Sequence, residues 1–495
     1  MDQITEVLAL FLSVNNLLMI TFGVLFGVLI GAIPGLTATM AIALALPFTF
    51  SMEPITAILL LVGIYKGGMY GGSVTAVLIR TPGSPAAACT LLDGYPLAQQ
   101  GQANKALQMS LYASCIADFI SNLSLLFFAG LLAKIALNFG APEYFWLICF
   151  SLTIIVSISG DSVLKGLISA GLGLLIALVG MDQVYGTPRL TFDNYNLLDG
   201  ISFVPLLIGL FAIPEVISFY FNKIKPFIKS ENSGEPVTLD EFKRSLKSII
   251  RGSIIGVTVG AIPGTGATVA SFISYSEAKR TSPNKANFGH GEIEGVAAAE
   301  SGNNAVAGAT LIPLLSLGIP GDVITAIILG AFMIHGLTPG PVLFQENITL
   351  IYALFCGIML SSIVLFVSGV LSIKYLSKIA DIPKDVLFLV VLMLCIYGAY
   401  AVNNNPFDII VMLCFGLLGY LFNQFKIATA PFLIAYVLGP MLEDNLRRSL
   451  LLGDNSMDIF FRSPITWIFI TLTIISVGFA VFRAFKHQNF SQAAN

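Results

Sequence analysis

The chain has 495 residues, of which 56% are hydrophobic and 11% charged, and its mean hydropathy is +0.87. Soluble domains carry charge on about a quarter of their residues, so this composition excludes a water-soluble enzyme, a nucleic-acid-binding protein and a disordered scaffold. Since a helix needs about 20 apolar residues to cross a bilayer, the chain predicts an all-α polytopic membrane protein with about ten or eleven crossings, and its net charge of -3 matters less than where the charges lie.

The N-terminal part of the chain is apolar and is interrupted twice by a Pro-Gly pair. No Lys or Arg occurs over positions 1–65, which predicts a periplasmic N-terminus by the positive-inside rule. Polar side chains flank both interruptions. The first group is Pro34, Gly35, Thr37 and Thr39, and the second is Ser73, Arg80, Thr81, Pro82 and Gly83.

Each Pro-Gly pair predicts the end of one half-helix and the start of another, because proline lacks an amide donor and glycine tolerates unusual dihedral angles. Within a bilayer such a break is tolerated only where it is buried in protein or lines a cavity. A half-helix that begins after a break presents free amides and a positive dipole end, which suit a substrate carboxylate. Hydroxyls and freed carbonyls also suit a sodium ion. Ordinary kinked helices are the alternative interpretation.

Ionisable side chains inside apolar segments are costly and therefore informative. Asp118 lies within the mostly apolar run 107–133, where it is either an ion or proton site or a contact to a partner helix. Arg80 precedes one Pro-Gly pair and Asp322 follows another. Arg80 either holds a substrate carboxylate bidentately or forms a neutralising pair with Asp322.

Residues 223–251 are the most densely charged stretch and carry more Lys and Arg than Asp and Glu. They predict a polar cytoplasmic linker. Pro-Gly pairs and polar side chains recur beyond it. The third group is Pro263, Gly264, Thr265 and Thr268, and the fourth is Pro320, Gly321 and Asp322. Glu300, Asn303 and Asn304 stand between these two groups, ahead of an apolar stretch.

The two halves of the chain resemble each other. The segment 31–39 recurs at 260–268, an offset of 229, and residues 80–83 match 318–321, an offset of 238. Near the end of each half, residues 204–208 correspond to 430–434, an offset of 226. Three anchors in the same order with a nearly constant offset predict an internal duplication. Paired helix breaks in two such halves indicate a transporter site near the bilayer midplane.

A periplasmic N-terminus and a cytoplasmic linker require an odd number of crossings in the first half, so the two structural repeats are predicted to be inverted. The predicted domains are a first transmembrane repeat over 1–222, the linker over 223–251, a second repeat over 252–442, and a C-terminal part over 443–495. The last part comprises a periplasmic mixed-charge loop, one extra helix over 464–482 and a cytoplasmic tail.

The assigned roles follow from these positions. Backbone amides at the four breaks are expected to bind the substrate carboxylates, with hydroxyl and amide side chains as further ligands. The substrate-binding set is Pro34, Gly35, Thr37, Ser73, Arg80, Thr81, Pro82, Gly83, Pro263, Gly264, Thr265, Asn304, Pro320 and Gly321. The ion-coupling set is Thr39, Thr268, Glu300, Asn303, Asp322 and Asp118.

No enzymatic or cofactor motif stands out. The chain has no HExxH, no GxSxG and no P-loop, and its six cysteines form no CxxC pair. We therefore expect no catalytic residues, no cofactor and no resident metal, apart from a transient sodium ion or a proton as the coupling ion. An intramembrane enzyme lacks its motif, and a passive channel would usually show rings of polar residues from several subunits.

Several segments resemble the large permease subunit of tripartite tricarboxylate transporters (TctA type). These segments are Gly31–Gly35 with Gly260–Gly264, Tyr70-Gly71-Gly72-Ser73, Asp93-Gly94-Tyr95-Pro96, residues 300–305, 317–321 and 336–341, and residues 439–443 with 445–448. The resemblance runs from about residue 20 to about residue 465. Arg80 stands where this family often has asparagine, and Asp322 where serine is common, which indicates either a substrate other than citrate or a compensated pair.

The resemblance implies a bacterial inner-membrane importer of organic di- or tricarboxylates, driven by sodium or protons. It also implies two partners, a small membrane subunit and a periplasmic solute-binding protein that delivers the substrate. A stand-alone carboxylate transporter and a passive anion channel are the alternatives. The identity of the carboxylate, the coupling ion and the oligomeric state stay open.

Overall fold

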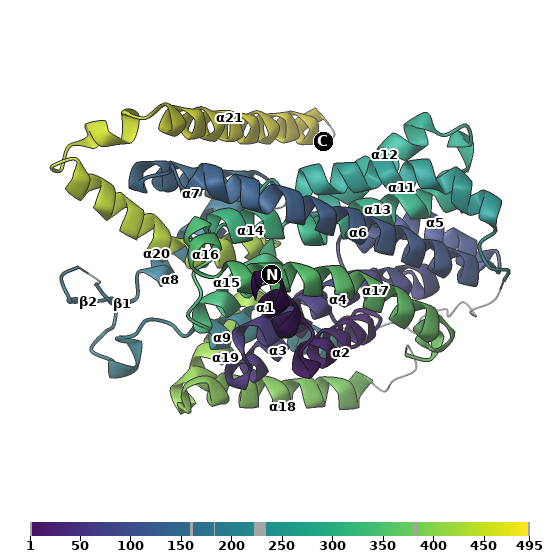
Figure 1. Cartoon of the computed structure of the whole chain (residues 1–495), viewed down its shortest axis with the longest axis horizontal. Coiled ribbons are helices and arrows are strands. Elements are labelled where there is room, and N and C mark those ends of the chain that lie inside the picture. The colour runs from purple at the N-terminus through teal and green to yellow at the C-terminus, as the bar shows by residue number, and fades with distance from the viewer. Residues whose placement is uncertain (1, 159–161, 183, 222–233, 380–383, 494–495) are drawn as a thin grey trace.

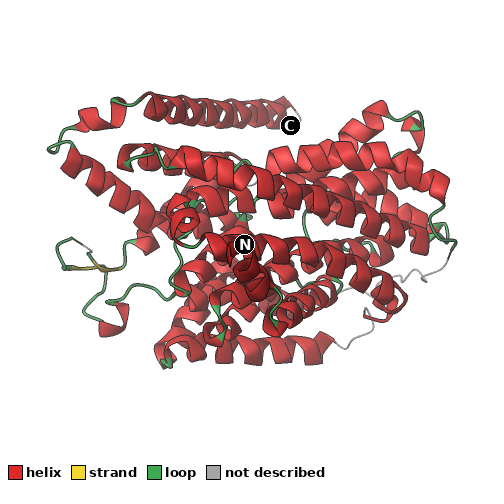
Figure 2. Cartoon of the chain, in the orientation of Figure 1, coloured by secondary structure: helices red, strands yellow, loops and turns green. Residues whose placement is uncertain are grey.

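The computed structural model describes residues 2–158, 162–182, 184–221, 234–379 and 384–493. Most of them are helical, and the described strands form one short hairpin (Figure 2). The helices before the hairpin are α1 (Asp2–Phe11), α2 (Val14–Gly31), α3 (Ala38–Ala45), η1 (Leu46–Ser51), α4 (Pro54–Ile79), α5 (Ala87–Gln99), α6 (Ala103–Ala136), α7 (Ala141–Ile158) and α8 (Val163–Ala177). Strands β1 (Gly180–Met181) and β2 (Pro188–Arg189) pair antiparallel, and η2 (Tyr195–Leu197), α9 (Phe203–Phe211) and α10 (Ile213–Phe221) follow.

The second half of the chain contains the remaining helices. They are α11 (Leu239–Gly260), α12 (Gly266–Thr281), η3 (Lys285–Asn287), α13 (Ile293–Ala309), α14 (Leu311–Leu317), α15 (Val323–Ile334), α16 (Pro341–Glu346), α17 (Ile348–Ile379), α18 (Lys384–Asn403), α19 (Pro406–Gln424), α20 (Thr429–Leu452), η4 (Met457–Phe461) and α21 (Pro464–Ala493). Helix α21 contains the extra C-terminal helix predicted over 464–482.

The prediction of an all-α polytopic membrane protein is confirmed. In the described residues, eight helices are long and apolar enough to cross a membrane, and four shorter apolar segments accompany them. Two of the short ones are α15 and the segment formed by α3 and η1, and each follows a Pro-Gly pair. The number of long helices is lower than the predicted ten or eleven crossings because some apolar segments are divided.

Rows of small residues bring two helix pairs into close contact. On α2, Gly23, Gly27 and Gly31 face the backbone of α4, and a Cβ added at Gly31 would lie 2.6 Å from the Gly68 carbonyl oxygen. On α11, Gly252, Gly256 and Gly260 face α13 in the same way. Small residues at intervals of four let helix backbones approach closely in a membrane, where packing rather than hydrophobicity drives association.

The helices pack in two groups, with few contacts between them. The first group contains α1–α6 and α11–α17, and the second contains α7–α10 and α18–α21. Contacts between the groups come mainly from α3, η1 and α15, which pack on α9, α18 and α20. The segments that follow two of the Pro-Gly pairs therefore lie at the boundary between the two groups.

The structure differs from the predicted linker over 223–251. Residues 222–233 lie outside the described residues, but α11 already begins at Leu239. Its start is stabilised by a capping box, in which the Thr238 hydroxyl accepts from the Glu241 amide and the Glu241 carboxylate accepts from the Thr238 amide. The charged residues of this stretch therefore belong partly to the first helix of the second half.

The predicted mixed-charge loop after residue 442 is wrong for its first part. Helix α20 continues through this position to Leu452. Arg447 pairs with Glu443 at 2.6 Å and Arg448 with Asp444 at 2.9 Å, both at the i,i+4 spacing that supports a helix. The charges that suggested a loop instead stabilise a helical turn, and the boundary between 442 and 443 falls within α20.

Polar contacts between the two halves hold together the end of the molecule where α5, α11 and α12 meet, on the right in Figure 1. Asp93 of α5 is buried, and one of its carboxylate oxygens accepts from the amides of Gly289, Gly291 and Glu292 at 2.7–2.9 Å. Its other oxygen accepts from the Tyr275 hydroxyl at 2.8 Å. This carboxylate therefore fixes the loop between α12 and α13 against α5.

At the opposite end, on the left in Figure 1, an ion-pair network joins the hairpin to α20. Arg447 donates to Asp182 at 2.6 Å, and Arg189 pairs with Glu443 at 2.7 Å. The hydrogen bonds from Arg447 hold the pKa of Asp182 below its usual range. We call this end the hairpin end and the other the linker end.

Candidate functional site

The first Pro-Gly pair lies in a non-helical break. Helix α2 ends at Gly31 and α3 begins at Ala38, with Pro34 and Gly35 between them. Gly35 has a φ of 92°, which a residue with a Cβ adopts only with strain. Thr37 is the N-cap of α3, and its hydroxyl accepts from the Met40 amide at 3.2 Å. The same segment carries Thr39, which is partly exposed.

The second pair lies in the break between α4 and α5. Arg80 is the C-cap of α4 and has a left-handed backbone with a φ of 56°. Its side chain is exposed, with the guanidinium carbon 5.7 Å from the centre of the Tyr95 ring. The Gly83 amide donates to the Gly72 carbonyl at 3.1 Å, and the Thr81 hydroxyl donates to the Ile79 carbonyl at 3.3 Å. Pro82 is partly exposed within this break.

The third and fourth pairs contact each other. Pro263 and Gly264 separate α11 from α12, Pro320 and Gly321 separate α14 from α15, and the Gly264 amide donates to the Gly321 carbonyl at 2.7 Å. The Thr265 hydroxyl donates to the carbonyls of Val259 and, at 2.9 Å, Ile262. Thr265 therefore does not cap α12, whose first turn also carries the partly exposed Thr268.

Asp322 is the N-cap of α15. Its carboxylate accepts from the Thr325 amide at 2.8 Å and from the Tyr65 hydroxyl of α4 at 2.6 Å. The protein's own negative charge thus occupies the start of this helix, where an external carboxylate would be repelled.

Two details of the sequence interpretation need correction. Arg80 and Asp322 form no ion pair in the structure, because Asp322 is engaged by Tyr65 and Thr325 while Arg80 lies beside Tyr95. The amides of Gly83 and Gly264 are not available to a substrate in this conformation, since each donates to a backbone carbonyl across its break. The four breaks are therefore not four equivalent carboxylate sites.

A row of polar residues on α6 forms a second candidate site away from the breaks. Ser110, Ser114, Asp118 and Asn122 are spaced at intervals of four, and all four are buried. Residues at this spacing lie on one face of a helix. We call these four residues, together with Lys66 of α4 and Glu300 of α13, the polar seam.

One half of the polar seam is a buried ion pair. The Lys66 ammonium lies 3.0 Å from the Asp118 carboxylate, 3.0 Å from the Asn122 side-chain oxygen and 2.9 Å from the Ile358 carbonyl of α17. Ser362 donates to the same Asp118 oxygen at 2.6 Å. Of the two interpretations of Asp118, the structure thus shows the contact to partner helices.

The other half of the polar seam surrounds a carboxylate that has no cationic partner among the described residues. Glu300 is fully buried and accepts from the hydroxyls of Thr90 and, at 3.0 Å, Ser114. The Asn304 amide donates to Glu300 at 3.3 Å and to Ser114 at 2.8 Å. The Ser73 hydroxyl, predicted to serve the break, donates to the Met69 carbonyl at 3.5 Å and lies near Glu300.

Three polar groups in this region have no hydrogen-bond partner within the described parts of the chain. They are the hydroxyls of Ser110 and Tyr70 and the side-chain amide of Asn303. All three side chains are fully buried, and Ser110 lies near the Glu300 carboxylate. Buried polar groups are usually paired, so unpaired ones in a cluster indicate a ligand.

Sequence reasoning missed five residues of this region, namely Lys66, Thr90, Ser110, Ser114 and Asn122. The regular spacing of Ser110, Ser114, Asp118 and Asn122 is visible in the sequence and could have indicated a polar helix face. Lys66 is the one charged side chain in the apolar stretch 54–79, which is the same signal that singled out Asp118. Thr90 carries no local signal, because its partner Glu300 lies far away along the chain.

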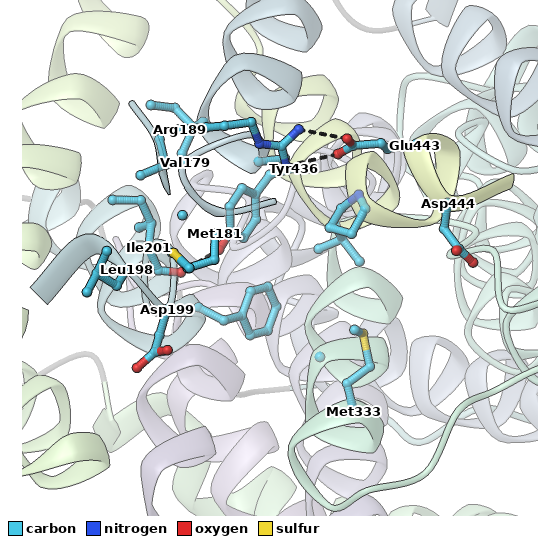
Figure 3. Close-up of a pocket in the computed structure, with 18 of the residues that line it drawn as sticks. Val179, Met181, Arg189, Leu198, Asp199, Ile201, Met333, Tyr436, Glu443 and Asp444 are labelled. Atoms are coloured by element: carbon cyan, nitrogen blue, oxygen red, sulfur yellow. Dashed lines mark hydrogen bonds and ion pairs between the residues drawn. The ribbon is translucent and has the colours of Figure 1, made fainter. Parts of the chain in front are cut away.

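The described residues also line an open pocket of about 530 Å³ at the hairpin end (Figure 3). Its walls come from the segment after α8, from α15 and from α20, and include Arg189, Asp199, Met333, Tyr436 and Glu443. None of the predicted site residues lines it. No group of three or more His, Cys, Asp or Glu side chains in the described part of the chain is arranged to hold a metal ion.

Comparison with known proteins identifies the family. The family described as "Tripartite tricarboxylate transporter TctA family" matches residues 17–434. The chain is 38% identical over 470 residues to the "Uncharacterized 52.8 kDa protein in TAR-I ttuC' 3'region" of Agrobacterium vitis, covering 94% of this chain and 92% of the relative. It is 37% identical over 233 residues to the "Uncharacterized protein in TAR-II ttuC' 3'region" of the same organism, covering 47% of this chain and 96% of that relative. No solved structure matches the chain.

Proposed function

Because the chain belongs to the tripartite tricarboxylate transporter TctA family, we propose that it is the large permease subunit of a secondary transporter that imports organic di- or tricarboxylates. Membership of this family, together with the apolar helices, identifies the chain as a multi-pass membrane protein of tricarboxylate transport. The observation that carries the finer proposal is the set of paired helix breaks, because such breaks form the binding sites of secondary transporters.

Corresponding backbone geometry in the two halves supports the internal repeat. Arg80 and Gly318 are at matched positions, each is a helix C-cap, and both have a left-handed backbone. Gly83 packs on Gly72 and Gly321 on Thr310, with the same sequence separation in each pair. The glycine row of α2 recurs on α11 at the same offset of 229 as the first Pro-Gly pair.

Inversion of the second repeat is supported by α8 and α19, which correspond in the order of helices. Near the start of α8, Lys165 donates to the Phe425 carbonyl at the end of α19, at 2.6 Å. At the start of α19, Asn405 donates to Asn196, in the segment that follows the end of α8 and the hairpin, at 2.8 Å. The two helices therefore run in opposite directions, as an inverted repeat requires.

The start of α12 is the part of the breaks that best suits a substrate carboxylate. Side chains cap α3 and α15, and the Ser84 hydroxyl accepts from the first amide of α5, whereas the Thr265 hydroxyl turns away from the first turn of α12. Its free amides and dipole favour an anion. Arg80, exposed and with a strained left-handed backbone at the second break of the first repeat, is the cation we assign to the substrate. Thr37, Thr39 and Thr268 would supply hydroxyl ligands.

Charge distribution supports an inner-membrane orientation with the linker end in the cytoplasm. Lys105, Arg244 and Arg280 lie near helix ends there, whereas at the hairpin end Arg189, Arg447 and Arg448 are each paired with Asp182, Glu443 or Asp444. In this orientation the periplasmic solute-binding protein would approach the hairpin end, and the small membrane subunit would pack against the lipid-facing helices.

Uptake of labelled citrate into membrane vesicles tests the proposal. Vesicles contain the chain with its small subunit, and the solute-binding protein is supplied outside, with or without a sodium or proton gradient. Gradient-dependent uptake that is lost in Arg80→Gln supports the proposal. Uptake without the two partners would favour a stand-alone transporter, and uptake indifferent to every ion gradient would favour a passive anion channel.

A further inference from the structure

The polar seam carries more negative than positive charge. Its ionisable members are the carboxylates of Asp118 and Glu300 and the ammonium of Lys66, and all three are at most 1% exposed. Lys66 neutralises Asp118 at 3.0 Å. Glu300 is held only by neutral hydroxyls and an amide. An ionised carboxylate at this depth needs a compensating cation, because burial without one is strongly unfavourable.

The internal repeat relates the two halves of the polar seam. Lys66 precedes Pro82 by the same sequence separation as Asn304 precedes Pro320, so the two positions correspond. Both reach α6, since Lys66 contacts Asp118 while Asn304 contacts Ser114 one turn earlier. In the first repeat a tethered ammonium is surrounded by three oxygens. In the second, an uncharged amide stands at the corresponding position and the carboxylate beside it lacks a cation among the described residues.

We infer that Glu300 and the hydroxyls around it bind one sodium ion, whereas Lys66 permanently supplies the cation for Asp118 in the other half of the polar seam. The ligand atoms are the Glu300 carboxylate and the hydroxyl oxygens of Ser73, Thr90, Ser110 and Ser114. Ser110 has no other partner among the described residues and is fully buried. This inference rests on the proposed function, and it adds the position and number of the coupling ions.

The ligand set and the charge decide the type of ion. A carboxylate with several hydroxyls suits a hard cation that takes oxygen ligands, whereas a proton needs a single acceptor. The polar seam carries one uncompensated negative charge, on Glu300. A monovalent cation balances this charge, whereas a divalent cation would leave a net positive charge. Lys66 removes the need for an ion at Asp118, and we therefore expect one exchangeable cation per chain rather than two.

The test measures sodium binding in the absence of substrate, partners and gradients. The full chain is purified into lipid nanodiscs, and its thermal unfolding midpoint is followed as sodium chloride replaces choline chloride at constant ionic strength and pH. The midpoint should rise with the sodium concentration, because an ion that binds only the folded state stabilises it. Glu300→Gln should abolish the rise, and Ser110→Ala should lower the apparent affinity for sodium about tenfold.

Glu294→Gln is the matched control. Glu294 lies on the same helix, is also buried and accepts from two serine hydroxyls, Ser248 at 2.5 Å and Ser282 at 2.6 Å. Unlike Glu300, it stands in the first turn of α13, where the positive end of the helix dipole favours its negative charge. This variant should keep the full sodium response. If Glu300→Gln does not fold, Ser110→Ala is the deciding variant. An unchanged apparent affinity for sodium in Ser110→Ala would then refute the proposed sodium site.

A midpoint that ignores sodium in the unmodified chain, or that responds only to pH, also overturns the inference. Failure of the inference is distinguishable from failure of the proposed function. Sodium-dependent stability without carboxylate uptake leaves the ion site standing and refutes the transporter. Carboxylate uptake by a chain whose unfolding midpoint does not change with sodium refutes the ion site and leaves the transporter function standing.

Discussion

Replacing Lys66 by Met should destabilise the protein far more than removing a surface charge does. The substitution keeps most of the side-chain volume but deletes the ammonium, which makes three contacts of 2.9–3.0 Å. Asp118 would remain buried, and one of its oxygens already lacks a partner among the described residues. Breaking a buried ion pair on one side costs about 3–5 kcal/mol, because the remaining charge is uncompensated.

Thermal unfolding in nanodiscs measures this cost, with two comparison variants. Lys105→Met removes a less buried pair, in which Lys105 lies 2.8 Å from Glu241, and should cost about 1 kcal/mol or less. The double variant Lys66→Met with Asp118→Asn removes both charges and should recover most of the loss. If Lys66→Met is no worse than Lys105→Met, or if the double variant is as unstable as the single one, the buried pair does not act as described.

Three further predictions concern the breaks and the hairpin end. Arg80→Gly should raise the unfolding midpoint, by relieving about 1 kcal/mol of left-handed strain, while abolishing citrate uptake; a variant that transports normally would remove Arg80 from the site. Gly83→Ala should cost about 1–3 kcal/mol in unfolding free energy, because its Cβ would lie 2.6 Å from a backbone atom, whereas Gly478→Ala, within α21 and with no atom within 4 Å, should not destabilise the protein. Because the pKa of Asp182 is lowered in the folded state, its contribution to stability is present at neutral pH and is lost as the pH falls below about 4. Arg447→Met should reduce that acid-dependent part of the unfolding curve, and an unchanged curve would contradict the assignment.

The positions of the helix breaks could be predicted from sequence because their cause is local. Proline lacks the amide and glycine adopts a positive φ wherever they stand, so helices end before Pro34, Pro82, Pro263 and Pro320. The hydrogen-bond partners of the amides at these breaks, by contrast, depend on residues far away along the chain. The amide of Gly264 donates to a carbonyl far along the chain, at Gly321, and no pattern within either segment indicates this pairing.

The loop predicted after residue 442 was wrong because the prediction used the charge of the segment and not the spacing of its charges. The residues from Glu443 to Arg448 were expected in a loop because the segment is polar, but opposite charges at a spacing of four equally favour a helix. Composition distinguishes buried from exposed segments and says little about their secondary structure. Spacing carries that information, and here it favours the helix that α20 forms.

Asp118 illustrates what a single sequence can and cannot establish about a membrane site. Its position in an apolar run predicted either an ion site or a partner helix, and the structure shows a tethered cation, Lys66, at the place where an ion would otherwise be needed. Both interpretations therefore express one requirement, which is that the buried Asp118 carboxylate needs a positive charge beside it, either from a bound ion or from a side chain of a partner helix. Glu300 has the same requirement, but no side chain of the described part of the chain meets it. A buried carboxylate with hydroxyl neighbours and no ammonium is thus more informative about coupling than the breaks themselves, because its charge must be balanced from outside the chain.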